Sequence, residues 1–68
     1  MGTDRRDVTE ELTRCLDRFP EFATVWNEAD EDVRERYLTW MSMPRWRSDR
    51  RWRVRSAVKT ALDTGQLR

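Results

Sequence analysis

The 68-residue chain contains no histidine, a single cysteine and only two glycines. Without histidine, it lacks the side chain that most often serves as general acid or base and as metal ligand. With glycine only at Gly2 and Gly65, no glycine-rich loop can surround a phosphate group. The lone Cys15 allows neither an intramolecular disulfide nor a CxxC site, and it suits a reducing, intracellular compartment. Catalysis is therefore the least supported class of function, and we expect no enzyme activity, cofactor or metal site.

Long apolar runs are also missing. The opening segment MGTDRRDVTEE contains no apolar stretch of the kind found in a secretory signal. No apolar run approaches the roughly 18 residues that a membrane-spanning helix needs. We therefore expect a cytoplasmic protein that does not cross a membrane.

The length of the chain allows one domain with a small hydrophobic core. Only 37% of its residues are hydrophobic, whereas 40% are charged. Four tryptophans, two phenylalanines and one tyrosine compensate, because each large ring can bury roughly 150–250 Å² of surface. We therefore expect a core built largely from aromatic side chains, with Trp26 and Trp40 at its centre.

The spacing of apolar residues predicts a first helix from about Asp7 to Phe19, preceded by a flexible N-terminus over residues 1–6. Asp7 can cap this helix, with Glu10 three residues further on, as in a capping box. Pro20 ends the helix, because the residue before a proline disfavours helical geometry. The face that this spacing turns inward is formed by Val8, Leu12, Cys15, Leu16 and Phe19.

Similar spacing predicts three further helices with short connections between them. The second runs from Pro20 to about Glu28. The third begins with a cap at Asp30 and ends near Ser42, before a connector at residues 44–47. The last begins with a cap at Ser48 and ends at Gly65. Their inward faces are formed by Phe22, Val25, Trp26 and Ala29 in the second, by Val33, Tyr37, Leu38, Trp40 and Met41 in the third, and by Val54, Ala57, Val58, Ala61 and Leu62 in the last.

No segment shows the alternation of apolar and polar residues that is typical of a half-buried strand. The prediction is therefore an all-α fold, a small four-helix domain of three main helices plus a short one, over residues 7–68. Cys15 lies on the apolar face of the first helix, where a buried and unreactive thiol is expected. Arg34 and Arg36 of the third helix are expected to face solvent.

The region from Glu11 to Gly65 carries a recognisable set of residues: Leu12, Leu16, Pro20, Trp26, Tyr37-Leu38-Thr39-Trp40-Met41, the arginine cluster at residues 50–53, Val54, Val58 and Gly65. This arrangement resembles the helical C-terminal domain of the bacteriocin-protection family (YdeI, or OmpD-associated). The linker at residues 42–48 departs from the Ala-Lys-rich connector of that family. The family's other domain has no counterpart here, so a stand-alone or trimmed version is expected. The resemblance implies a helical fold and a non-enzymatic, intracellular module.

Charge is distributed unevenly along the chain. Residues 1–44 hold six basic and eleven acidic side chains, a balance of −5, whereas residues 45–68 hold eight basic and two acidic side chains, a balance of +6. The stretch from Pro44 to Lys59 concentrates seven cationic residues around Trp46 and Trp52, with Asp49 as its only acid. Such asymmetry indicates a surface for a partner of opposite charge.

This stretch predicts a protein-binding surface, because tryptophan and arginine are the residue types enriched in binding hot spots. The partner would be a protein with an acidic surface, or a second copy of the chain whose acidic half meets the basic half. No membrane and no small-molecule substrate is expected. The predicted binding residues are Arg45, Trp46, Arg47, Arg50, Arg51, Trp52, Arg55 and Lys59.

Two alternatives stay open for the same stretch. The basic last helix can neutralise phosphates and tryptophan can stack on unpaired bases, which would make the partner a nucleic acid. Against this, a recognition helix that begins Asp30-Glu31-Asp32 would repel the phosphates of bound DNA. The other alternative is that the arginines only solvate the helix, stack on tryptophan rings and pair with the chain's own acids.

The orientation of Trp52 bears on this choice. At 100° per residue, Trp52 lies about 160° around the helix from Val54, almost opposite the inward face. It is therefore either exposed or packed against another element, such as the connector or the third helix.

Overall fold

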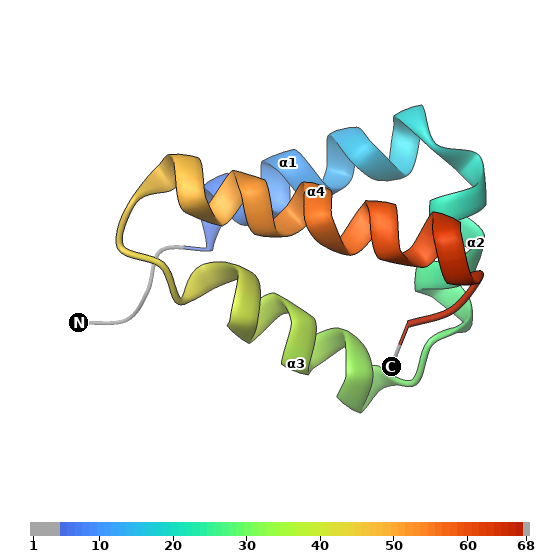
Figure 1. The fold of residues 1–68 in the computed structure, drawn as a ribbon. Helices are drawn as coiled ribbons and strands as arrows, with labels where there is room; N and C mark the ends of the chain where they lie inside the picture. Colours follow the sequence, from blue (N-terminus) through green and yellow to red (C-terminus); the bar gives the residue numbers. More distant parts are fainter. Residues whose placement is uncertain (1–4, 68) are drawn as a thin grey trace.

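A computed structural model describes residues 5–67 and folds them into four α-helices joined by short connections (Figure 1). No strand occurs among these residues, so the predicted all-α, four-helix class is confirmed. In chain order the helices are α1 (Arg6–Arg18), α2 (Pro20–Glu28), α3 (Glu31–Ser42) and α4 (Arg47–Thr64).

The helices form a small bundle that α2 closes at one end. α1 and α4 lie side by side and run in the same direction, whereas α3 runs in the opposite direction along α4 (Figure 1). α2 crosses between the end of α1 and the start of α3. This topology places the start of α1, the end of α3 and the start of α4 at the other end of the molecule.

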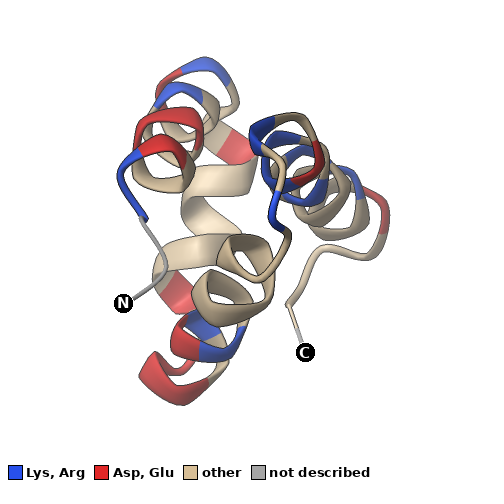
Figure 2. Ribbon diagram, turned by 90° about the vertical axis from the view of Figure 1, so that its left-hand side faces the viewer, with Lys and Arg blue, Asp and Glu red and all other residues tan. Residues whose placement is uncertain are grey.

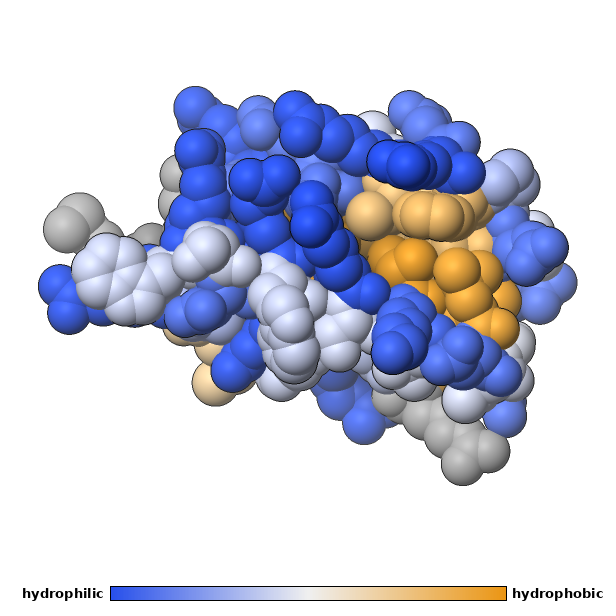
Figure 3. All heavy atoms as spheres, turned by 45° about the horizontal axis from the view of Figure 1, so that its top comes forward, coloured by the Kyte–Doolittle hydropathy of each residue, from blue (hydrophilic) through white to orange (hydrophobic). Residues whose placement is uncertain are grey.

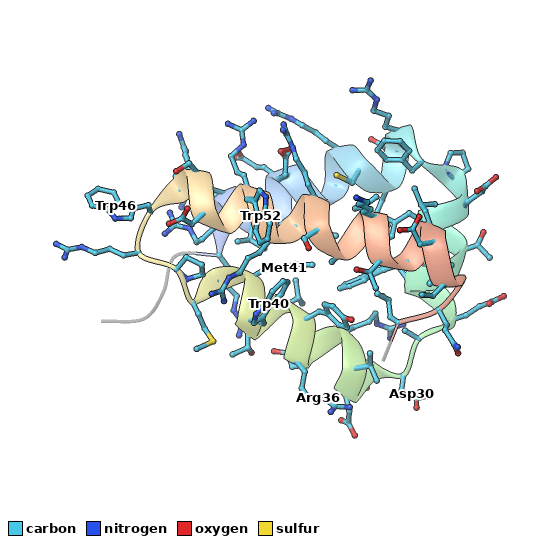
Figure 4. All side chains as sticks on the ribbon, in the orientation of Figure 1. Asp30, Arg36, Trp40, Met41, Trp46 and Trp52 are labelled. Atoms are coloured by element: carbon cyan, nitrogen blue, oxygen red, sulfur yellow. The ribbon has the colours of Figure 1, made fainter. Side chains whose placement is uncertain are left out.

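The core lies between the four helices. Phe22, Met41, Val8 and Val54 are its largest fully buried side chains, and Met41 points inward between α3 and α4 in Figure 4. The small side chains of α4 let the neighbouring helices approach its backbone closely. The buried hydrophobic residues are Val8, Leu12, Cys15, Phe22, Trp26, Met41, Val54, Ala57, Val58 and Ala61.

Of the two tryptophans predicted at the centre of the core, only one is buried. Trp26 is buried as predicted, with its ring centroid 6.0 Å from that of Phe22, but Trp40 is only partly buried. The side chain that α4 places opposite Trp40 is Arg53, whose guanidinium carbon lies 4.9 Å from the centroid of the indole. Tyr37 meets the same indole edge-on at 6.2 Å. Trp40 therefore lies at the edge of the core, and its predicted central place is wrong.

Leu62 also differs from its predicted place on the inward face of the last helix. Its side chain is 37% exposed, whereas the preceding Ala61 is fully buried. One residue is a rotation of about 100° around a helix, and at this point that rotation moves the side chain from the core to the surface between α1 and α4.

Two predicted helix boundaries are confirmed. Pro20 stands at the start of α2, where its missing N–H group costs no hydrogen bond. Gly65 ends α4 in the left-handed conformation, with φ of 76°, and its N–H group donates to the carbonyl of Ala61 at 2.7 Å. Glycine adopts this conformation without the steric penalty of a Cβ atom.

The predicted side-chain caps do not form. Asp30 occupies the predicted position before α3, but its side chain makes no capping hydrogen bond. α4 begins at Arg47, so Ser48 lies inside the helix and is exposed. Asp7 lies inside α1, where its carboxylate binds an arginine instead. For Asp7, the contact with α4 replaces the predicted cap.

The N-terminal boundary is a further correction. The predicted flexible segment covered residues 1–6, of which residues 1–4 lie outside the described part of the chain. Arg5 stands at the N-cap position of α1, and Arg6 is the first residue of the helix. Arg5 donates to the carboxylate of Glu35 at 3.0 Å and to the hydroxyl of Thr39 at 3.2 Å, so it ties the start of α1 to α3.

Arg34 was predicted to face solvent but is half-buried and has a structural role. Its Nη1 donates to the carbonyl oxygens of Trp26, Asn27 and Ala29 at 3.3, 3.2 and 2.8 Å. The carbonyls of Trp26 and Asn27 lie in the last turn of α2 and that of Ala29 lies at its C-cap, where a helix leaves backbone acceptors without the donor four residues further on. Arg34 therefore caps α2 from α3, whereas Arg36 is exposed as predicted.

Candidate functional site

The two tryptophans of the basic stretch are exposed. Trp46 and Trp52 are each 65% exposed, and with Met43 at 67% they are the most exposed large hydrophobic side chains among residues 5–67. Figure 4 shows Trp46 pointing away from the bundle at the turn into α4, and Trp52 standing on the outer side of α4. The helical geometry that places Trp52 opposite Val54 thus leads to exposure rather than to packing against another element.

Arg50 is committed to the fold. Its Nε donates to Oδ2 of Asp7 at 2.9 Å, and its Nη2 contacts the same oxygen. Its Nη1 donates to the carbonyl oxygens of Pro44 and Arg45 at 2.8 and 2.9 Å. The Arg50 side chain is only 15% exposed. It therefore joins α1, the connector and α4, and its predicted place on the partner-binding surface is corrected.

Asp7 is the buried end of this contact, with a side chain that is 9% exposed. The hydrogen bond from Arg50 lowers the pKa of the Asp7 carboxyl, and the charge of Arg50 and the N–H group of Val8 act in the same direction against the effect of burial. Arg47 adds a weaker attraction from 3.8 Å. Asp7 therefore stays ionised at neutral pH and keeps Arg50 in place.

Arg53 is also held inside the molecule. Its Nη1 donates to the carbonyl oxygen of Trp40 at 2.8 Å, close to the end of α3, and its guanidinium stacks on the Trp40 ring. The arrangement supplies a donor to a carbonyl of the last helical turn and covers the exposed edge of the core. Arg53 therefore contributes to the junction of α3 and α4.

Arg51 and Arg55 take an intermediate position. Both contact Oε1 of the buried Glu11 through Nε, at 3.3 and 3.4 Å respectively. Their side chains remain 43% and 67% exposed, and their terminal guanidinium nitrogens form no hydrogen bond within residues 5–67. Glu11 therefore orients the two arginines without occupying the groups that would bind a partner.

Arg45 and Arg47 are both exposed. The guanidinium carbon of Arg45 lies 5.7 Å from the centroid of the Trp46 ring. The Arg47 side chain is 71% exposed. A shallow groove of about 260 Å³ between Ser48, Arg51, Trp52 and Arg55 continues this surface along α4. We define the Arg/Trp surface as Arg45, Trp46, Arg47, Arg51, Trp52 and Arg55.

The charge asymmetry of the sequence becomes a spatial one. Figure 2 shows basic residues gathered on α4 and the turn before it, whereas acidic residues mark the start of α3 on the far side of the bundle. Part of the asymmetry is neutralised internally, because Asp7 and Glu11 of α1 face α4. The Arg/Trp surface lies beyond these two carboxylates, while Lys59 of the predicted set is exposed further along α4.

Residues 5–67 contain no cluster of three or more histidine, cysteine or acidic side chains that could hold a metal ion. Within the same range, no helix is both long and apolar enough to cross a membrane. Cys15 is buried, and its desolvation raises the pKa of the thiol, with the nearby charge of Glu11 acting in the same direction. A thiol in this setting is mostly protonated at neutral pH and therefore a poor nucleophile.

No protein-family model, curated protein or solved structure matches the chain.

Proposed function

We propose that the protein is a non-enzymatic interaction module whose Arg/Trp surface binds an acidic region of a protein partner. The exposure of Trp46 and Trp52 is the observation that carries this proposal. Large aromatic side chains in a small domain with a limited core would add stability if they were buried, yet these two lie on the surface. The resemblance to the bacteriocin-protection family, in which the module would be non-enzymatic and intracellular, points the same way.

The energetics of the Arg/Trp surface suit a binding role. Each exposed indole that loses roughly 100–150 Å² of accessible surface in a complex would contribute about 3 kcal/mol of hydrophobic free energy. The neighbouring guanidinium groups can form paired hydrogen bonds with Asp or Glu of the partner. They would also accelerate encounter with an acidic surface in a salt-dependent way. Trp46 and Trp52 would thus act as anchors and the arginines as the source of selectivity.

A second copy of the chain is one candidate partner. The start of α3 carries Asp30, Glu31 and Asp32, all exposed and on the far side of the bundle from the Arg/Trp surface. Contact between these two regions of different copies would bring opposite charges together. Sedimentation at increasing protein concentration separates this case from binding to another protein, because only self-association makes the apparent mass depend on concentration.

A nucleic acid is the rival partner, and the structure changes how it should be tested. Reversing the charge of Arg50 or Arg53 would break contacts within the fold, so a loss of binding would be ambiguous. Reversal to Glu at Arg45, Arg47 and Arg55 changes exposed side chains. Because Arg47 and Arg55 also contact Asp7 and Glu11, circular dichroism checks that the triple variant is folded. If the partner is a nucleic acid, affinity for single-stranded oligonucleotides falls steeply with salt and is lost in this triple variant.

The experiment that tests the proposal is affinity capture with wild-type protein and with Trp52→Ala, followed by mass spectrometry and by titration of the purified partner. We expect Trp52→Ala to lose most of the affinity while its far-ultraviolet circular dichroism is unchanged. Arg36→Ala, which removes an exposed arginine from α3, is the matched control and should bind as wild type does. Equal affinity of wild type and Trp52→Ala would refute the proposal.

A further inference from the structure

A second surface, separate from the tryptophans, lies in the groove between α1 and α4. The groove has a volume of about 500 Å³. Figure 3 shows it as an apolar patch with hydrophilic residues around it. Its apolar lining is formed by Cys15 of α1, by Phe19 at the C-cap of α1, and by Val58 and Leu62 of α4.

This lining reaches solvent. Leu62 is 37% exposed, and Phe19 is partly buried and packs against the core. The residues occur as pairs four positions apart on each helix, Cys15 with Phe19 and Val58 with Leu62. Residues four apart lie one above the other on a helix, so the apolar floor runs along both helices for about one turn.

Cations border the apolar floor on both helices. Arg14 and Arg18 line the groove from α1, and Arg55 and Lys59 line it from α4, again with the members of each pair four positions apart. The ion pairs within residues 5–67 include Arg55 but not Arg14, Arg18 or Lys59. The acid that lines the groove is Asp63. The groove therefore combines an apolar floor with two rows of positive charge.

Two parallel rows of cations select the shape of the occupant. A small amphiphile with one carboxylate head can satisfy the cations at only one end of the groove. An amphipathic helix with carboxylates on both flanks of its apolar stripe can satisfy both rows while its stripe covers the floor. The nine residues from Arg55 to Asp63 span roughly 12 Å along α4, which is about two turns of a helix laid alongside.

We propose that the groove between α1 and α4 binds an amphipathic helix of a partner protein whose apolar stripe is flanked on both sides by Asp or Glu. In this arrangement a third helix packs into the surface of two side-by-side helices, and its flanking carboxylates pair with Arg14 and Arg18 on one side and with Arg55 and Lys59 on the other. This is the helix-in-groove mode of recognition. The proposal goes beyond the Arg/Trp surface and does not depend on either exposed tryptophan.

The test uses two designed peptides of about 20 residues, long enough to form a helix on binding. Both carry a leucine stripe, which one peptide flanks with Glu and the other with Lys. We expect the Glu-flanked peptide to bind at least about tenfold more tightly by isothermal titration calorimetry, because the groove presents cations on both sides. Amide chemical-shift changes in the ¹⁵N-labelled protein should centre on Cys15, Phe19, Val58 and Leu62.

Variants of the protein show whether the groove is the site. Leu62→Ser removes exposed apolar surface and Lys59→Glu reverses a rim charge. Each should weaken the Glu-flanked peptide about tenfold or more. Both positions are exposed, so the fold should survive, and circular dichroism checks this. Lys59→Glu should in addition strengthen the Lys-flanked peptide. Arg36→Ala, which removes an exposed cation that does not line the groove, is the matched control and should leave affinity for the peptide unchanged.

Several results would overturn the proposal. They are equal affinity for the two peptides, binding that depends on Trp52 rather than on Leu62, and tight binding of laurate with no binding of either peptide. The last result would identify the groove as a site for small amphiphiles. Dependence on Trp52 would assign the acidic peptide to the Arg/Trp surface, whereas the other two results leave the proposed function of that surface untouched.

Discussion

The arginines of one short stretch divide into two sets with different surroundings. Arg50 and Arg53 are held by the chain's own carboxylate, backbone carbonyls and indole, whereas Arg45 and Arg47 project into solvent. The residue type is the same, and all four positions lie within nine residues of the sequence. What separates the sets is the element that each side chain meets. An arginine-rich stretch is therefore not by itself a binding surface.

Asp7 and Glu11 of α1 determine much of this division. They lie four residues apart and so share one face of the helix. Because α1 and α4 run side by side in the same direction, that face meets the start of α4. Asp7 accepts a hydrogen bond from Nε of Arg50 at 2.9 Å, while Glu11 contacts both Arg51 and Arg55 at the longer distances of 3.3 and 3.4 Å.

The largest effect should follow from removing the partner of Arg50. Asp7→Ala leaves a mostly buried guanidinium without its carboxylate, and we expect a loss of about 3–5 kcal/mol in the free energy of unfolding. A domain of this size has roughly 3–10 kcal/mol in total, so the variant should lose a large part of its stability. Urea denaturation followed by circular dichroism measures this. Stability close to that of wild type would show that Arg50 is not a structural residue.

Trp40→Ala should have the next largest effect, because its ring packs against the core beneath Arg53. We expect a loss of about 2 kcal/mol in the free energy of unfolding, less than the 3–5 kcal/mol typical of a fully buried aromatic residue. The same urea titration gives the value. An unchanged midpoint would mean that the ring is not packed as described.

Low pH should weaken the contact between Asp7 and Arg50 in the wild-type protein. The pKa of Asp7 is lower in the folded state than in the unfolded chain, so its contribution to stability is complete above about pH 4 and is lost as the pH falls through the folded-state value. We expect the free energy of unfolding of wild type to decrease in this range. Asp7→Asn should show a shallower decrease in the same urea titrations. Parallel pH profiles would contradict the assigned role of the carboxylate.

Arg47→Ala should have a much smaller effect than Asp7→Ala. The Arg47 side chain is 71% exposed and lies 3.8 Å from Asp7, the geometry of a surface ion pair. Such pairs contribute about 0–1 kcal/mol, and we expect a change within about 0.5 kcal/mol. A loss comparable to that of Asp7→Ala would show that Arg47, like Arg50 and Arg53, holds the fold together.

Apolar spacing was enough to predict the helices and most of the core. Pro20 and Gly65 fixed two boundaries because each restricts the backbone in a known way. The same periodicity placed Trp52 opposite Val54, which is where the structure has it. These properties are local, since they depend only on residues within a few positions of one another.

The contacts between helices could not be predicted in the same way. Asp7 has the local signature of a cap, and only the packing of α1 against α4 shows that it binds Arg50 instead. Arg34 has the spacing of a solvent-facing residue, yet it caps α2 through three carbonyls. Trp40 lies on the inward face of α3, but the guanidinium of Arg53 covers its ring at the edge of the core. Each case depends on which residue of a distant element lies opposite.

The free energy of unfolding of Trp52→Ala tests most directly the division between side chains that hold the fold together and side chains of the Arg/Trp surface. If Trp52 belongs only to the surface, urea denaturation should give a value within about 0.5 kcal/mol of wild type, because no packed contact is lost. A loss of about 2 kcal/mol or more would place Trp52 among the residues that hold the fold together. The Arg/Trp surface would then lose the anchor on which its proposed function depends.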